Sequence, residues 1–215
     1  MGLVLHLNPD DPDRNAIAQA AVVLKRSGVA VFPTETVYGL GADLRSAAGI
    51  ERVFRIKRRP PDLPLMIHCA NQMQARFYLA EWSERAEMLA RVYWPGPLAL
   101  VLRRSDVVPG IVAGGKSVGI RVVADRVAQE LIDELGAPIA GTSANRHGHP
   151  ATSRFDRIER EVIDEVDVAL DSGRCGEEVA STVLDLTVDP PRVVRAGVVP
   201  VAGIEEVLRL KVVGP

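Results

Sequence analysis

The segment 32–41 reads FPTETVYGLG. An apolar run ends at its first residue, and threonines, a glutamate and two glycines follow. Residues 29–32 predict a strand, and Thr34, Glu35 and Thr36 then place oxygen atoms where that strand leaves the sheet. The two glycines that follow allow positive φ or a close approach of the backbone to a ligand. The segment fits a ligand site, and it fits equally a turn in which the threonines cap local backbone groups.

Four cations lie within the five residues 55–59, directly before two prolines. The apolar spacing of residues 47–57 predicts a helix that Ser46 caps, so the cations lie on its last turn and in the loop that follows. Cations at this position complement the helix dipole, but four are more than that requires. Arginine and lysine are common ligands of phosphate, so the cluster indicates an anionic ligand as readily as dipole compensation.

The segment 138–145, PIAGTSAN, repeats the arrangement of a strand that ends in small polar residues. Small side chains at the end of a strand leave room for a ligand in open α/β sheets. A local turn explains Ser143 and Asn145 equally well. Arg121, at the end of another apolar run, fits either an anion clamp or a surface cation.

Together and in this order, these segments resemble the YrdC-like threonylcarbamoyl-AMP synthases. The matching motifs extend over nearly the whole chain, at residues 33–41, 57–60, 64–68, 94–98, 118–121, 143–145, 181–183 and 194–197. The departures are local: Arg58 replaces a glycine, Leu63 replaces a polar residue, and Val123, Thr142 and Ala196 replace prolines. Of these, Leu63 removes one possible polar contact to ATP.

The resemblance implies an enzyme that makes threonylcarbamoyl-AMP and pyrophosphate from L-threonine, bicarbonate or CO2, and ATP. This product is the activated intermediate for threonylcarbamoyl modification of adenosine 37 in tRNAs that read ANN codons. We also expect Mg2+ to enter with ATP, held through its phosphates with few ligands from the protein, and no residue is assigned as a metal ligand. The resemblance further implies hand-off of the adenylate to a tRNA threonylcarbamoyl transferase complex, and it leaves room for a weak contact with tRNA itself.

The same resemblance assigns two groups of site residues. The nucleotide group comprises Lys57, Arg59, Ser117, Gly141, Ser143, Asn145 and Arg195. Within it, Lys57 and Arg59 are the catalytic pair, because cations stabilise the charge that gathers at the α-phosphate. The threonine group comprises Thr34, His68, Arg121 and Ser181, with Arg121 as partner of the α-carboxylate and Tyr38 as an additional hydroxyl or wall.

Alternating strands and helices must position these residues. Apolar runs predict strands at 29–32, 65–68, 98–102, 118–122, 138–140, 183–186 and 193–195, with an edge strand within residues 1–8. Helical spacing predicts helices at 14–26, 47–57, 83–92, 125–135, 154–164 and 203–209. No helix separates 98–102 from 118–122, so we expect a mixed sheet. The expected fold is α/β, a mixed twisted sheet with flanking helices around a large concave cavity, in one YrdC-like domain over residues 1–215.

Composition agrees with such a domain. The chain has 215 residues, enough for a substantial core, and its formal net charge of −2 disfavours a protein that holds nucleic acid by bulk charge. Cys69 and Cys175 have no partners at zinc spacing, and neither a signal peptide nor a run of about 20 apolar residues is visible. We therefore expect a cytoplasmic protein without a membrane partner.

Three alternatives remain open at this point. One is an RNA-binding module with a basic concavity at residues 55–59, and another is a nucleotide-binding paralogue that lacks threonine activation. The third is a carbamoyltransferase related to the hydrogenase-maturation enzymes that contain this domain, although those chains are much longer. In the synthase, we expect the polar loop 146–153 to act as a lid over the labile adenylate, because Gly148 and Pro150 punctuate it.

Overall fold

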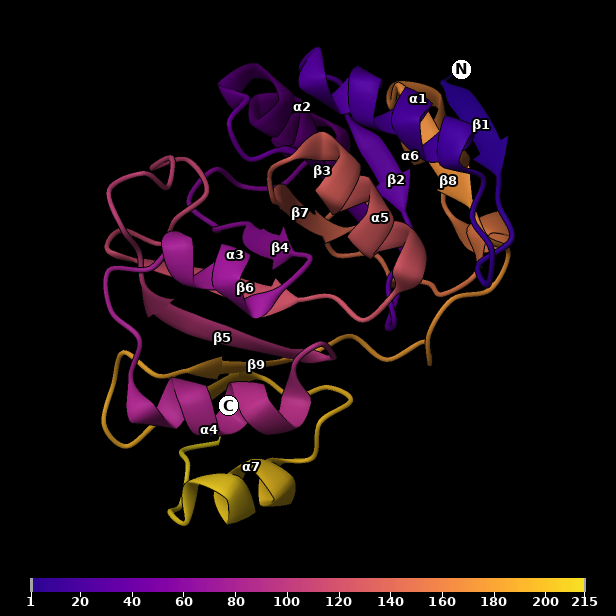
Figure 1. The fold of residues 1–215 in the computed structure, drawn as a ribbon. Helices are drawn as coiled ribbons and strands as arrows, with labels where there is room; N and C mark the ends of the chain where they lie inside the picture. Colours follow the sequence, from indigo (N-terminus) through magenta and orange to yellow (C-terminus); the bar gives the residue numbers. More distant parts are fainter. Residues whose placement is uncertain (1, 215) are drawn as a thin grey trace.

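A computed structural model describes residues 2–214, in which ten strands form one mixed sheet (Figure 1). The strands lie in the order β1-β8-β2-β3-β7-β4-β6-β5-β9-β10. Their bounds are β1 Leu3–His6, β2 Ala30–Phe32, β3 Gly39–Asp43, β4 Met66–Cys69, β5 Leu98–Arg103, β6 Ser117–Val122, β7 Ile139–Ser143, β8 Val168–Asp171, β9 Thr182–Asp185 and β10 Arg192–Arg195.

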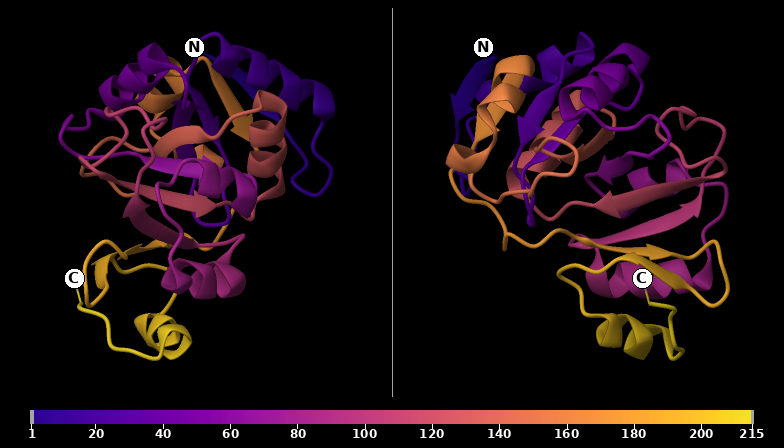
Figure 2. Two further views of the ribbon diagram at one scale, coloured as in Figure 1. Left: turned by 60° about the vertical axis from the view of Figure 1, so that its left-hand side comes forward. Right: turned by 180° about the vertical axis from the view of Figure 1, so that it is seen from behind.

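Seven α-helices flank this sheet in the described part of the chain. Their bounds are α1 Arg14–Lys25, α2 Ala47–Lys57, α3 Gln72–Phe77, α4 Glu84–Tyr93, α5 Arg126–Leu135, α6 Arg160–Glu165 and α7 Val201–Leu208. In both views of Figure 2, the C-terminal helix α7 lies at the end of the molecule away from the N-terminus. No helix within residues 2–214 combines the length and the apolar character that a membrane span needs.

The mixed sheet confirms the expected fold class. Strands β5 and β6 pair antiparallel, as the missing crossover helix predicted, whereas β4 with β6 and β5 with β9 pair parallel. Strand β1 lies at the edge of the sheet, where it pairs with β8. It falls within the edge strand expected at residues 1–8, of which Met1 lies outside the described residues.

Strand β2 is buried on both faces of the sheet. Val31 packs into one core, with residues of α2, α4 and α6, while Ala30 and Phe32 pack into a second core with α1 and α5. A strand covered on both faces needs an unbroken apolar run, which is why residues 29–32 carry no polar alternation.

Strand β3 was missed by sequence analysis because two of its five residues are glycines. Neither Gly39 nor Gly41 has positive φ. A Cβ atom on Gly41 would lie 2.4 Å from Cγ2 of Ile139, and one on Gly39 would lie 2.7 Å from the ring of Phe32. The glycines therefore permit close packing inside the sheet. Positive φ at these glycines is not observed, while a close approach of the backbone to a ligand stays a prediction.

The helix predicted at 154–164 is also wrong over its first part. Phe155–Arg157 forms a short 3-10 helix, the chain is extended at Ile158, and α6 begins only at Arg160. The side chain of Glu159 accepts a hydrogen bond from the backbone N–H of Arg146, at 2.8 Å. This tertiary contact, together with the extended backbone at Ile158, separates the two helical pieces.

The close approach at Gly41 leads to a stability prediction. We expect Gly41→Ala to lower the free energy of unfolding by about 1–3 kcal/mol, because the added methyl group overpacks the contact with Ile139. Urea unfolding measures the change. Gly110→Ala is the control, because a Cβ there meets no atom within 4 Å, and its effect should stay within about 0.5 kcal/mol. Equal stability of the two variants would contradict the packing argument.

Candidate functional site

The residues predicted for the site line two adjoining cavities. The smaller has a volume of about 50 Å³ and the larger about 520 Å³. All four residues of the threonine group line the small cavity, and all seven residues of the nucleotide group line the large one. Met66, Thr142, Ser143 and Arg195 line both cavities. The structure therefore separates the two predicted groups in space and joins them along one shared wall, while the ligands assigned to them stay a prediction.

The register of the sheet places His68 beside Arg121 in the small cavity. The two are paired positions on the neighbouring parallel strands β4 and β6, so their side chains leave the same face. Burial, and then the positive charge of Arg121, lower the pKa of His68 to about 3, so the imidazole is neutral. Among residues 2–214, its Nδ1 atom has no hydrogen-bond partner. This buried ring nitrogen is therefore left unsatisfied by the described residues, and His68 lines the small cavity.

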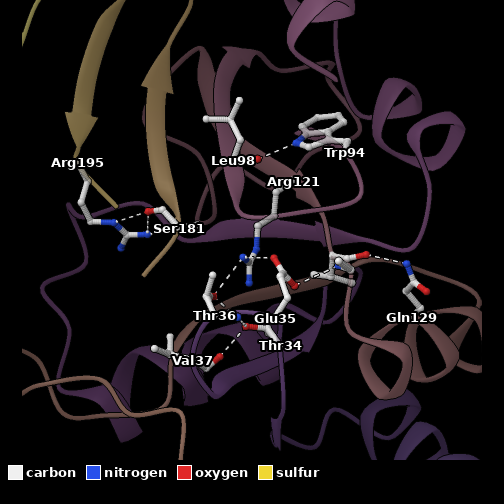
Figure 3. A network of polar contacts seen from close by, with 12 residues as sticks. Thr34, Glu35, Thr36, Val37, Trp94, Leu98, Arg121, Gln129, Ser181 and Arg195 are labelled. Atoms are coloured by element: carbon white, nitrogen blue, oxygen red, sulfur yellow. Dashed lines mark hydrogen bonds and ion pairs between the residues drawn. The ribbon is translucent and has the colours of Figure 1, made fainter. Parts of the chain in front are cut away.

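Arg121 is held by two residues of the segment 32–41. Its Nη1 donates a hydrogen bond to Oε1 of Glu35 at 2.8 Å and contacts Oγ1 of Thr36 at 3.4 Å (Figure 3). Its Nε is buried and has no partner in the described part of the chain. A guanidinium group with unused donors at the wall of a cavity can bind a carboxylate.

Thr34 and Tyr38 contribute walls to the small cavity, and their hydroxyl groups are already engaged. Thr34 Oγ1 donates to the carbonyl of Val37 at 2.6 Å and accepts from the N–H of Thr36 at 3.3 Å, which is the local capping turn considered above. The hydroxyl of Tyr38 donates to the carbonyl of Gly173 at 3.2 Å. Burial raises the pKa of Tyr38 far above its ordinary value.

Arg195 on β10 ties the two cavities together. Its Nε and Nη2 donate to the carbonyl of Ser181 at 3.0 and 2.8 Å, and Nη2 also contacts Oγ of Ser181 at 3.0 Å (Figure 3). Ser181 ends the connection 172–181, which runs from β8 to β9. Burial, followed by the charges of Arg121 and Arg59, lowers the pKa of Arg195. The cation therefore lies in a region of positive potential.

Lys57 binds the loop that follows β7. Its Nζ donates to the backbone carbonyls of Ser143 and Asn145, at 2.7 and 2.9 Å, and contacts their side-chain oxygens at 3.2 and 3.1 Å. Burial, and then the charge of Arg59, lower the pKa of Lys57 to about 7. Lys57 therefore shapes the wall of the large cavity in addition to carrying charge.

Arg59 and Ser117 complete the polar wall of the large cavity. Arg59 donates from Nε to the carbonyl of Leu63 at 3.3 Å and from Nη2 to that of Pro64 at 2.9 Å. Burial lowers the pKa of this half-buried arginine. Ser117 donates from Oγ to the carbonyl of Gly114 at 3.2 Å. Arg59 is held by neutral carbonyl groups, which leave its charge uncompensated.

The loop 146–153 forms part of the large cavity through His147 and Gly148. It is attached along its length: Nδ1 of His149 lies 2.8 Å from Oε2 of Glu159, and the carbonyl of Thr152 accepts from the N–H of Tyr38 at 2.9 Å. The loop already serves as a wall, and its closure over a bound adenylate stays a prediction.

Sequence analysis gave no role to two residues that the structure places at the site. Met66 lines both cavities, and Glu35 binds Arg121. The signal for Glu35 was its position between two threonines in the opening motif, but its partner comes from a strand 86 residues away.

Comparison with known proteins gives matches along most of the chain. The family model Sua5/YciO/YrdC, described as "Telomere recombination", matches residues 22–197. The threonylcarbamoyl-AMP synthase of Pyrococcus abyssi is 40% identical over 190 residues, which are 88% of this chain and 56% of that protein. This chain spans between 52% and 58% of three curated synthases.

Two solved structures share the fold at substantial identity. The crystal structure of P. abyssi Sua5 complexed with L-threonine aligns with a TM-score of 0.92 and 37% identity, over 98% of this chain and 62% of that one. Escherichia coli YciO aligns with a TM-score of 0.86 and 30% identity, over 94% and 98% of the two chains. The E. coli protein is described as uncharacterized.

The lowered pKa of Lys57 predicts a pH effect on stability. Between about 7 and the ordinary value of 10.5, the unfolded chain holds a proton at Lys57 that the folded protein lacks. Stability therefore rises with pH across this window, by up to about 1.4 kcal/mol per pH unit from this residue. Urea unfolding from pH 7 to 10 should show that Lys57→Met and Lys57→Arg both lose this part of the slope, because neither side chain titrates there. Equal slopes in all three proteins would refute the assignment.

Proposed function

The chain belongs to the Sua5/YciO/YrdC family, and from this premise we propose that it is an L-threonylcarbamoyladenylate synthase, a nucleotidyltransferase. The single observation that carries the proposal is the pair of joined cavities. One is suited to a small amino acid with a carboxylate, the other to a nucleotide, and both share Ser143 and Arg195 as walls. The relative whose structure holds L-threonine supports the identity of the small ligand.

In the small cavity, the α-carboxylate of threonine would bind Arg121 through the donors that Glu35 leaves unused. His68 offers a neutral ring nitrogen to the same molecule. Because the cavity is narrow, it would orient the amino group toward the shared wall. There its nitrogen would bond to the carbon of CO2 with loss of a proton, or to that of bicarbonate with loss of water, to give the carbamate. Fixing the nucleophile beside the nucleotide supplies the proximity that a two-substrate reaction needs.

In the large cavity, the triphosphate would lie among Lys57, Arg59 and Arg195. Apolar side chains at the remaining wall, among them Val101 and Val183, suit the adenine base. The carbamate oxygen of N-carboxythreonine attacks the α-phosphorus, the bond to the β-phosphate oxygen breaks, and pyrophosphate leaves. Both reactants are anions, so these cations stabilise the charge that gathers in the transition state.

We propose that Mg2+ enters with the triphosphate, whose leaving group it would neutralise. Residues 2–214 contain no group of three or more His, Cys, Asp or Glu side chains arranged around a metal, so this proposal relies on the phosphates as ligands. The proposal further comprises one catalytic domain over residues 1–215, a cytoplasmic location, a weak contact with tRNA and hand-off of the labile adenylate to a tRNA threonylcarbamoyl transferase complex.

The assay that tests this function follows pyrophosphate release by the purified protein with ATP, L-threonine and bicarbonate. We expect release to require threonine and bicarbonate together, because the nucleophile is made from both. Serine should be a poorer substrate, because the lost contact of one methyl group costs about 1–3 kcal/mol of binding free energy at most. A rate unchanged by omission of either substrate would exclude the synthase, and ATP binding without turnover would identify the nucleotide-binding paralogue.

Substitutions in the two cavities should affect different kinetic and binding constants. Arg121→Ala should raise the Kd for threonine while that for ATP changes little, because it removes the partner of the α-carboxylate. Arg59→Ala should lower kcat and weaken the binding of ATP. The expected loss of binding free energy is about 1.5–3 kcal/mol, which is typical of a lost hydrogen bond to a charged group. Arg58→Ala is the matched control, because exposed Arg58 does not line the large cavity and its activity should stay near that of the wild type. An unchanged threonine Kd in Arg121→Ala would show that the carboxylate binds elsewhere.

A further inference from the structure

The buried ion pair between Glu35 and Arg121 has a geometry that the binding scheme above does not explain. The two side chains are 15% and 4% exposed, and their contact of 2.8 Å uses only Nη1 of the arginine. The second contact of the guanidinium, with Thr36, uses the same Nη1 atom. Both protein contacts thus lie on one side of the group, while the buried Nε on the other side has no partner among residues 2–214.

A guanidinium group has two edges that can bind a carboxylate with two parallel hydrogen bonds. One edge presents Nη1 with Nη2, and the other presents Nε with Nη2. Glu35 and Thr36 both accept from Nη1, which has two N–H groups, and together they remove the first edge from use. The second edge contains the buried Nε, which has no partner in the described part of the chain, and Arg121 lines the small cavity.

Glu35 is itself fixed at two points, so it can hold the arginine in one orientation. Its Oε2 accepts a hydrogen bond from the backbone N–H of Ala124 at 3.1 Å, while Oε1 binds Arg121. Ala124 lies between the end of β6 and Asp125, which caps α5. The carboxylate therefore spans from the strand that carries Arg121 to the helix that follows, and its position does not depend on the arginine alone.

We propose that Glu35 is a positioning residue that orients Arg121, so that the Nε–Nη2 edge receives the α-carboxylate of the amino-acid substrate. This inference rests on the proposed function, and it adds a residue to which that scheme assigns no role. Glu35 acts through Arg121 and does not contact the substrate. It also compensates the charge of a buried arginine, which would otherwise lie unpaired when the cavity is empty.

Binding measurements with the full chain test the proposal. We expect Glu35→Ala to raise the Kd for L-threonine about tenfold or more, with the Kd for ATP within about twofold of wild type. Glu35→Gln, which keeps one oxygen acceptor but no charge, should be intermediate and serves if the alanine variant does not fold. L-threonine amide supplies the diagnostic readout, because it lacks the carboxylate. The ratio of amide Kd to threonine Kd should fall in both variants.

Asp167→Asn is the matched control. Like Glu35, Asp167 binds an arginine and a backbone N–H, with Oδ2 at 2.6 Å from Arg52 and 2.7 Å from the N–H of Val29, but it does not line either cavity. The Asp167→Asn variant should be less stable than the wild type, but its ratio of amide Kd to threonine Kd should be unchanged.

The results distinguish a failure of the proposed function from a failure of the positioning role of Glu35. A wild-type protein that does not bind threonine removes the proposed function and this inference with it. If the wild type binds threonine but the Glu35 variants keep its Kd and its amide ratio, the positioning role alone is overturned. Tighter threonine binding by Glu35→Ala overturns it as well, because Glu35 would then compete with the substrate for Arg121.

Discussion

Four cationic side chains converge on two joined cavities, and the way each is compensated determines what the site can bind. Lys57, Arg59 and Arg195 donate to backbone carbonyls, which carry no charge to offset the positive charge of these groups when they are protonated. Arg121 is paired with the carboxylate of Glu35. The large cavity therefore suits a polyanion, while the small one suits a ligand with a single carboxylate.

The carbonyl groups that this arrangement requires lie in two loops and at the end of strand β7. Carbonyl groups of the turn after α2 accept hydrogen bonds from Arg59, and those at the end of β7 accept from Lys57. A carbonyl of the connection 172–181 accepts from Arg195. Irregular backbone has carbonyls free of sheet and helix hydrogen bonds, so it can accept from side chains. This explains why the site lies where strands end and why its loops are closely held.

Sequence analysis predicted many elements of the sheet and helices because burial imposes periodic patterns on them. It failed at β3, where Gly39 and Gly41 replace the branched residues typical of a strand. It also joined the two helical pieces between 154 and 164, since the contact of Glu159 with Arg146 leaves no local trace. It also predicted neither β8 nor α3. The family resemblance, in contrast, depended on side-chain identity and was insensitive to these errors.

The sequence by itself determined which chemical groups the protein can present and in which motifs they occur, because residue types and local spacing need no fold to be recognised. The family resemblance also divided these residues into a nucleotide group and a threonine group. Only the tertiary structure decided that the two groups line two cavities with a shared wall, and which atoms of each residue remain unused. The pairing of Glu35 with Arg121 and of Lys57 with the end of β7 joins residues 86 to 88 positions apart. Such contacts follow from strand order and register, which depend on packing over the whole chain.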